Sequence, residues 1–252
     1  EGVDRTGILS EIVAAARLVG APVVEMRRDR MDDAVGANHQ CVVAQTAQYP
    51  YTDLDELMAP GPSGDRLYLA LDHLQDVQNL GTLLRTAEAM GVAGVILPGR
   101  RSAAVTPAVV NASSGAVEHL RIALVTNLPQ TLEALKAEGV WVAGLDAAPE
   151  AKSLSKTDLT GPLCLVVGAE GAGLSRLARD RCDWLVAIPM VGKVESLNAS
   201  VAGSIVLAAA RQARLDAAER RRGEEDSVRM PRPDPLAQLS GADEDTESLA
   251  EA

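Results

Sequence analysis

The amino-acid sequence predicts an α/β protein built on a parallel sheet with helices on both faces. Short apolar runs typical of buried strands recur along residues 67–222, and helical stretches of about ten or more residues separate them. Strands joined by crossover helices of that length lie parallel and are covered on both faces. The 252 residues suit one large domain, or an ordinary domain with a smaller one.

The first 58 residues predict only part of a small α/β domain. Apolar residues follow a helical period from Ile8 to Ala16, and the runs Val23–Met26 and Cys41–Gln45 are suited to strands. These apolar residues are too few to form a core alone. We therefore expect either that the segment packs against the rest of the chain or that the first part of its domain is missing. Residues 59–66, in a stretch rich in Pro and Gly, are expected to be a linker.

Residues 67–222 carry the regular alternation of the main domain. The expected strands are Leu67–Leu71, Gly94–Leu97, Leu120–Val125, Val140–Leu145, Leu163–Val167 and Leu185–Ile188. The expected helices are Leu80–Met90, one that starts at Thr106-Pro107, Pro129–Glu138 and the Ala-rich Asn198–Arg220. Residues 223–252 are rich in Pro, Asp and Glu, which predicts an acidic, disordered tail.

The charge distribution bears on whether a nucleic acid is the partner. The net charge of −11 argues against one, but residues 216–252 hold 11 acidic residues against 5 Arg, which leaves −5 for residues 1–215. Arginine outnumbers lysine by 20 to 4, and a guanidinium binds phosphate through two parallel hydrogen bonds. With no Phe, two Trp and three Tyr, we expect any RNA to be bound without aromatic stacking.

Other protein classes are not favoured. No apolar run approaches the ~20 residues that span a bilayer, and the opening EGVDRTGILSEIV lacks the regions of a signal peptide. Cys41, Cys164 and Cys182 form no CxxC pair, which argues against a disulfide scaffold and a zinc ribbon. No G-x-G-x-x-G follows a strand, as a dinucleotide oxidoreductase would require. We expect a cytoplasmic protein with no membrane contact and no metal site.

Polar residues gather in three segments that follow predicted strands, the edge at which parallel α/β sheets bind ligands. In the first segment Asn79 stands at the start of a helix, and Gly81 and Arg85 share one helix face. Glycine costs roughly 1 kcal/mol in a helix relative to alanine, so its missing side chain should make room for something beside the guanidinium. The alternative is an ordinary helix with a capping Asn, a tolerated Gly and a solvent-facing Arg. The spacing of these residues does not distinguish this helix from a binding site.

The second and third segments follow two later strands. In the second, an apolar strand enters a turn with Gly168, Glu170 and Gly171, where backbone amides can approach a ligand closely. A plain strand-to-helix turn is the alternative, but an acid at position 170 needs a partner. In the third, Ser196 and Asn198 stand at the mouth of the long helix, where free amide donors point outward. Simple capping is the alternative there.

Together the three segments resemble a known family. NLGTLLRTA (79–87), LVVGAEGAGLS (165–175) and IPMVGKVESLNASVA (188–202), in this order and spacing, look like the motifs of the SpoU (TrmH) family of RNA ribose 2′-O-methyltransferases, in the SPOUT superfamily. The likeness is closest to the RlmB type, which acts on a guanosine of 23S ribosomal RNA. It covers residues 67–214, and residues 7–58 resemble the second half of the family's small N-terminal RNA substrate-binding domain.

The resemblance implies a C-terminal deep trefoil knot, a homodimer, and S-adenosylmethionine as cofactor. The residues that match the family's catalytic positions are Arg85, Asn79, Glu170 and Asn198. Those that match its cofactor site are Gly168, Glu170, Gly171, Ile188, Met190, Ser196 and Leu197. For binding of the ribosomal RNA substrate we expect Arg85, a His39 that matches a His-Gln pair of the small domain, and Arg100 and Arg101 after a strand end. The alternatives are an ordinary strand-entry residue at position 39 and solvated side chains at positions 100 and 101.

Arg85 is the candidate group that acts on the ribose hydroxyl. Because arginine keeps its proton, we interpret it as stabilising the developing alkoxide, and a base role assisted by desolvation stays open. Methyl transfer from a sulfonium is an in-line displacement that needs no metal. The segment Ala199–Ala213 is apolar around most of its circumference, so we expect a second subunit to cover what one sheet cannot.

The alternative functions differ in substrate or in class. One is a relative that methylates tRNA or an antibiotic-binding site of ribosomal RNA. The other is a non-catalytic RNA-binding or ribosome-assembly protein of the same fold. Asn79, Arg85, Glu170 and Asn198 are all present, which favours an enzyme.

Overall fold

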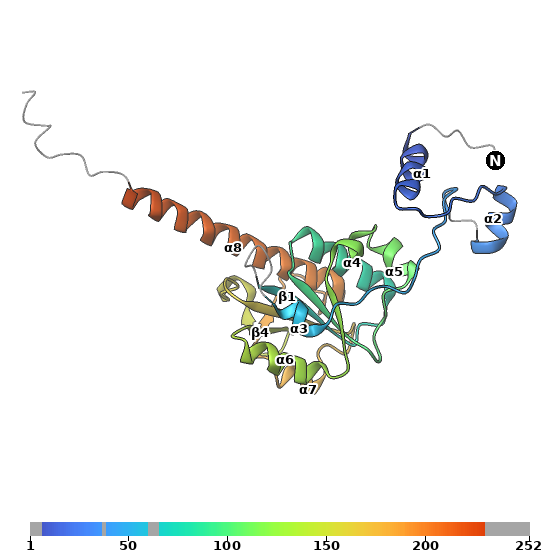
Figure 1. Ribbon diagram of the computed structural model, residues 1–252. Coiled ribbons are helices and arrows are strands. Elements are labelled where there is room, and N and C mark those ends of the chain that lie inside the picture. The colour runs from blue at the N-terminus through green and yellow to red at the C-terminus, as the bar shows by residue number, and fades with distance from the viewer. Residues whose placement is uncertain (1–6, 37–38, 60–65, 230–252) are drawn as a thin grey trace, which may run out of the picture. The chain divides into compact units, whose positions relative to one another are not determined.

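The structure is a computed structural model that describes residues 7–36, 39–59 and 66–229 (Figure 1). The chain divides into two compact units, Glu1–Gln48 and Tyr49–Ala252. The domain boundary thus falls at residue 48 and not at the predicted residue 58. The reason is packing, because α3 (Leu54–Met58) places the fully buried Leu57 in a core of the larger unit. Most of the predicted linker lies outside the described residues.

The smaller unit contains two short helices, α1 (Ile8–Leu18) and α2 (Arg28–Val35), neither of which buries a residue. The strands predicted at Val23–Met26 and Cys41–Gln45 are wrong, since both segments are irregular. A strand is stabilised by side chains paired across a ladder and by packing of one face. The described part of this unit offers these segments neither.

The larger unit is built on a seven-stranded parallel sheet. In chain order the strands are β1 (Leu67–Asp72), β2 (Gly94–Pro98), β3 (Ile122–Val125), β4 (Trp141–Leu145), β5 (Lys152–Ser153), β6 (Leu163–Gly168) and β7 (Trp184–Ala187). Their order across the sheet is β3-β2-β1-β6-β4-β7-β5, and every neighbouring pair is parallel. The six predicted strands are confirmed, and the short edge strand β5 is an addition.

Helices connect the strands. They are α4 (Val77–Ala89), α5 (Pro107–Ala112), η1 (Ala116–His119), α6 (Leu128–Ala137), η2 (Leu154–Lys156), α7 (Arg176–Arg179) and α8 (Ala199–Arg229). α4 begins earlier than predicted because the Asp76 carboxylate accepts a hydrogen bond from the Asn79 backbone amide and caps the helix. None of the helices in the described part of the chain is long and apolar enough to span a bilayer.

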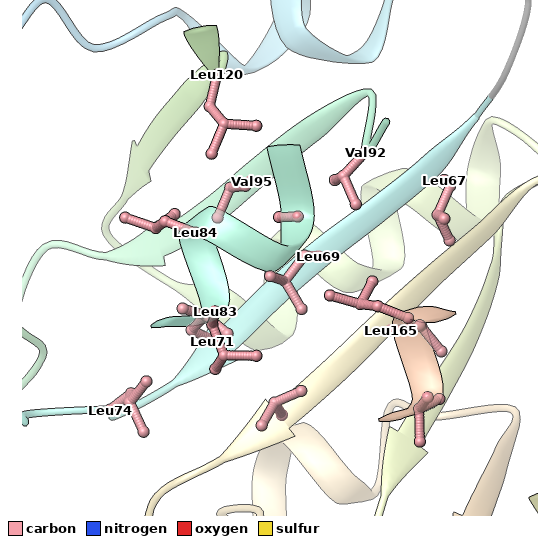
Figure 2. Packing of buried hydrophobic residues seen from close by; sticks show 14 of the residues in the cluster. Leu67, Leu69, Leu71, Leu74, Leu83, Leu84, Val92, Val95, Leu120 and Leu165 are labelled. Carbon is pink, nitrogen blue, oxygen red and sulfur yellow. The ribbon is translucent and has the colours of Figure 1, made fainter. Parts of the chain in front are cut away.

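Side chains alternate between two cores along the central strands. Leu69 and Leu71 of β1 point to one core, and Tyr68 points to the other. Figure 2 shows these β1 leucines facing Leu83 and Leu84 of α4. In Figure 1, α4 and α8 lie on one side of the sheet and α6 and α7 on the other. The predicted parallel sheet with helices on both faces is therefore confirmed.

The end of the last helix differs from prediction. α8 continues to Arg229, so residues 223–229, predicted to be disordered, are helical. Arg and Glu favour helices, and no proline stops the helix before position 231. The rest of the predicted tail, 230–252, lies outside the described residues.

Candidate active site

The carboxyl ends of β1, β6 and β7 carry the three polar segments. β1 and β6 are neighbours, and their register pairs Asp72 with Gly168, the last residue of each strand. The turns that follow these two strands therefore begin side by side. After β7, beyond β4 in the sheet, the chain returns to the start of α8.

Glu170 joins the three segments. Its Oε2 accepts a hydrogen bond of 3.1 Å from Asn79 Nδ2, and its Oε1 accepts one of 3.4 Å from Asn198 Nδ2. Asn79 is only 7% exposed, in the first turn of α4. Residues from three distant segments thus form one polar junction, which we call the Glu170 junction. The expected partner for this acid is confirmed, and it has two.

Asn198 performs two tasks at once. Its Oδ1 accepts hydrogen bonds from Ser200 N at 2.9 Å and Ser200 Oγ at 2.6 Å, which caps α8. Its Nδ2 is left to donate to Glu170. The orientation of the amide follows from this hydrogen-bond pattern. Capping and a place in the site are therefore not alternatives at this position.

The second turn folds back on the strand that precedes it. Ala169 and Gly173 exchange two backbone hydrogen bonds, of 3.1 and 2.9 Å. A Cβ placed on Gly168 would lie 2.2 Å from the carbonyl carbon and oxygen of Gly173. Glycine at 168 is therefore required by the turn itself. Gly171 and Gly173 have φ of +75° and +65°, a region that glycine adopts without strain.

Arg85 lies on an exposed flank of α4, one helical turn after Gly81. A Cβ on Gly81 would lie 2.4 Å from Ala112 Cβ, so the end of α5 occupies the space that the sequence predicted beside the guanidinium. Arg85 Nη1 donates to Ser114 Oγ at 3.0 Å, two residues beyond that contact. Within the described residues Arg85 makes no hydrogen bond to the Glu170 junction. Its neighbours leave it accessible to a substrate.

Asp72 and His73 at this edge were missed by sequence reasoning. The Asp72 side chain is 1% exposed; its Oδ2 accepts from Ser175 N and its Oδ1 lies 2.6 Å from His73 Nδ1. Ser175 Oγ in turn accepts from Ala178 N and caps α7. Asp72 thus ties β1 to the chain beyond the second turn. The available signal was an acid that directly follows a fully apolar strand run.

His73 has φ of +60°, which is uncommon for a residue with a side chain. Such backbone strain is often found at functional sites. Its side chain is 39% exposed. It therefore places an imidazole at the edge where the three segments meet.

The other predicted residues of this edge follow two strands. Arg100 and Arg101, after β2, are exposed. After β7, Ile188 packs against the core while Met190 is 40% exposed. Ser196 is exposed and Leu197 half-buried in the same irregular segment.

His39 belongs to the smaller unit and has a structural role there. Its side chain is 3% exposed, its Nε2 lies 2.9 Å from Asp32 Oδ1, and its Nδ1 accepts from the Cys41 amide. That acceptor role assigns the ring proton to Nε2, which donates to Asp32.

The cysteines of the larger unit are unsuited to nucleophilic chemistry. Burial raises the pKa of the Cys182 thiol to about 12 and also raises that of Cys164. A thiol must lose its proton to attack. Within the described residues no group of three or more potential metal ligands is found.

Comparison with known proteins agrees with the motif pattern. The model of the SpoU rRNA Methylase family matches residues 66–208, which include all three segments. A TrmH family tRNA/rRNA methyltransferase of Bacillus subtilis is 42% identical over 203 residues, 80% of this chain and 81% of the relative.

Solved structures of methyltransferases share the fold. An rRNA methyltransferase from Sinorhizobium meliloti with bound AdoMet (S-adenosylmethionine) aligns with a TM-score of 0.68 and 27% identity, over 81% of this chain and 77% of that one. An RNA 2′-O ribose methyltransferase aligns with a TM-score of 0.55 and 28% identity, over 68% of this chain and 62% of that one.

Proposed function

The chain belongs to the SpoU rRNA Methylase family, and we propose from this premise that it transfers a methyl group from S-adenosylmethionine to the 2′-hydroxyl of a ribose in RNA. The Glu170 junction carries the proposal, because it joins residues of all three motifs by hydrogen bonds. Arg85, which is exposed and makes no ion pair within the described residues, favours an enzyme over a non-catalytic relative.

The residues at the carboxyl edge fit the cofactor. A Cβ placed on Gly171, Gly173 or Gly192 would meet no atom within 4 Å, so the backbone of the second and third turns borders open space. The residues that would hold the cofactor are Gly168, Glu170, Gly171, Ile188, Met190, Ser196 and Leu197. When bound, S-adenosylmethionine supplies a methyl group on a positively charged sulfur.

The chain's own part in the reaction concerns the acceptor hydroxyl. As its oxygen bonds to the methyl group, the hydroxyl proton passes to solvent water; a guanidinium, which keeps its own proton, can stabilise the negative charge that develops on the oxygen. We assign this role to Arg85, which Ser114 holds on the flank of α4 by a hydrogen bond of 3.0 Å. Asn79 and Asn198 orient Glu170, and through it they hold the second turn in place.

We propose ribosomal RNA as the substrate, with a guanosine of 23S RNA as the target. The motif pattern of the RlmB type supports this, and Arg100 and Arg101 are exposed at the same edge to meet phosphates. One alternative is tRNA, since the Bacillus relative is named for both tRNA and rRNA. The other is an antibiotic-binding site of ribosomal RNA. The smaller unit would add RNA affinity.

We also propose that the domain is knotted and dimeric. The knot is what the family resemblance implies. After β7 the chain returns as α8 to pack on α4 and β6, where a Cβ on Gly203 would lie 2.6 Å from Leu83 Cδ2 and 3.1 Å from Val167 Cγ2. Val201 and Ile205, four residues apart on α8, are 45% and 38% exposed. They form a face that a second subunit would cover.

Two measurements test the function. Calorimetry should detect binding of S-adenosylmethionine and of its demethylated product, which a non-catalytic relative need not bind. Labelled methyl groups should then enter unmodified 23S RNA and not tRNA transcripts. Incorporation into tRNA alone would replace the proposed substrate, and no cofactor binding would refute the enzyme.

A further inference from the structure

A pocket opens at the amino-terminal ends of the strands, opposite the carboxyl ends that carry the Glu170 junction. It encloses about 420 Å³ and is lined by the first residues of β4, β5, β6 and β7. Leu163 of β6 lies in this pocket, and Gly168 at the other end of the same strand begins the second turn of the candidate active site. Five residue steps at ~3.3 Å put the two sites roughly 17 Å apart. The pocket is therefore separate from the Glu170 junction.

Both tryptophans of the chain line this pocket. Trp141 begins β4 and Trp184 begins β7, and because these strands are neighbours their rings lie 5.6 Å apart at 45°. Trp141 is 57% exposed, which is unusual for so large an apolar side chain. The Trp184 Nε1 is buried and has no hydrogen-bond partner among the described residues. The pocket thus offers an exposed aromatic side chain to a ligand.

The charges around these rings favour an anion. Lys152 Nζ lies 5.3 Å from the centre of the Trp184 ring, and Lys156 also lines the pocket. These are two of the chain's four lysines, and neither has an ion-pair partner among the described residues. Asp158 is the acid of the pocket; its Oδ1 accepts from Thr160 N and Thr160 Oγ1 at 2.9 and 2.7 Å and is held in the turn. The pocket therefore has two lysines and one carboxylate, and that carboxylate is already hydrogen-bonded to Thr160.

We propose that this Trp141 pocket binds a nucleotide of single-stranded RNA, with the base on the exposed face of Trp141 and the phosphate beside Lys152 and Lys156. An aromatic ring beside cations is the combination with which proteins hold single strands without sequence preference. The proposal deepens the proposed function, because it adds a contact for RNA distant from the methylated ribose. It also departs from the expectation that RNA is bound without aromatic stacking, since the fold brings the two tryptophans of the chain together.

Intrinsic fluorescence tests the proposal, because both tryptophans lie in this one pocket. The full chain is titrated with single-stranded pentaadenylate and pentauridylate, with inorganic phosphate at equal ionic strength as a control. We expect saturable quenching by the oligonucleotides and none by phosphate. Unchanged fluorescence while a labelled oligonucleotide binds by anisotropy would overturn the proposal.

Variants separate stacking from charge. Trp141→Ala should weaken oligonucleotide binding about 5- to 150-fold, the range of one lost base–aromatic stack. Lys152→Ala and Lys156→Ala should each lower the slope of log affinity against log salt by about 0.7. Lys136→Ala is the matched control and should leave the slope unchanged, because Lys136 Nζ is already paired with Asp183 at 3.0 Å.

The two proposals fail in different ways. Binding of short oligonucleotides needs no methyl transfer, so absence of cofactor-dependent methylation would leave the quenching and its loss in Trp141→Ala intact. Conversely, an active methyltransferase whose Trp141→Ala variant binds oligonucleotides as the parent does would refute the pocket and not the enzyme.

Discussion

At the scale of single residues, the proposed chemistry depends most directly on Arg85. Replacement by alanine should lower the rate of methyl transfer by about 10²–10³, the usual effect of removing one group that stabilises a developing oxyanion. Arg85→Lys should fail almost as badly, because a point charge does not reproduce the guanidinium fork. Calorimetry should give an unchanged cofactor affinity in both.

The control for Arg85 lies on the same helix. Glu88 is exposed three residues further along α4, and Glu88→Gln should leave the rate unchanged. A lysine variant at position 85 with near-normal turnover would contradict the proposed geometry.

Glu170 tests whether the junction matters for the cofactor. A carboxylate accepts from both Asn79 and Asn198, whereas glutamine has one acceptor oxygen and would turn an amino group toward one of them. We expect Glu170→Gln to weaken binding of S-adenosylmethionine about tenfold, roughly 1.4 kcal/mol, by calorimetry. Glu195→Gln, on an exposed residue of the third segment, is the comparison variant and should bind normally.

The sequence indicated which residues belong to the candidate active site, but it did not show which residues they contact. It expected a partner for Glu170, and the structure supplies Asn79 and Asn198. The missing side chain of Gly81 predicted space for another group beside Arg85, and Ala112 of the same chain occupies that space. Spacing along a helix cannot tell a ligand from a neighbouring helix, because either one excludes a Cβ.

At the scale of elements, Tyr49 holds the first residues of the larger unit against η1 and the residue that follows it. Its hydroxyl donates to the carbonyls of Val117 and Leu120, and burial, with nearby Glu118, raises its pKa to about 12. The stabilising contribution is complete below pH 10, the ordinary tyrosine value, and is lost as pH rises through about 12.

Tyr49→Phe should therefore cost about 1 kcal/mol near neutral pH, the net value of a typical hydrogen bond. Denaturant unfolding from pH 8 to 12 should show the difference between parent and variant shrinking above pH 10. A difference that stays constant or grows with pH would contradict the account.

Strand predictions were confirmed where neighbouring strands are available for pairing, and were wrong where none is present among the described residues. Leu163–Val167 reads as a buried strand and lies between β1 and β4 in the centre of the sheet. Cys41–Gln45 has a similar apolar run, yet it is irregular in a unit whose helices bury nothing. Strand propensity is decided by neighbouring strands, and a linear pattern does not contain them.

At the scale of the whole molecule, the exposed face of α8 should make a dimer. Val206 and Leu207 are buried against the domain, while Val201 and Ile205 stay exposed. Light scattering should show a dimer for the parent and a monomer for Val201→Asp combined with Ile205→Asp.

Two controls accompany the dimer test: a substitution at another exposed leucine, and a chain that lacks the acidic C-terminal residues. Leu177 of α7 is 56% exposed away from α8, and Leu177→Asp should remain a dimer. A chain ending at Arg222 should also remain a dimer, because the acidic residues beyond it offer no apolar stripe. A monomeric parent would refute the argument from the helix face.

The sheet order could not have been predicted from the sequence. Alternation of strands and helices predicts a parallel sheet, but the placement of β6 between β1 and β4 depends on contacts distant in the chain. That placement pairs Asp72 with Gly168 and brings the first and second motifs together. The pattern of strands placed the polar segments at the carboxyl ends of the strands, but it did not show that β1 and β6 are neighbours.

We expect the residues at the carboxyl ends of β1, β6 and β7 to methylate the ribose of RNA. The most direct measurement is nucleoside analysis by mass spectrometry of unmodified 23S RNA after incubation with the protein and S-adenosylmethionine. We predict one 2′-O-methylated nucleoside, a guanosine, which forms about 10²–10³ times more slowly when Arg85→Ala replaces the parent. A methyl group on a base, or equal ribose methylation by the Arg85→Ala variant, would contradict it.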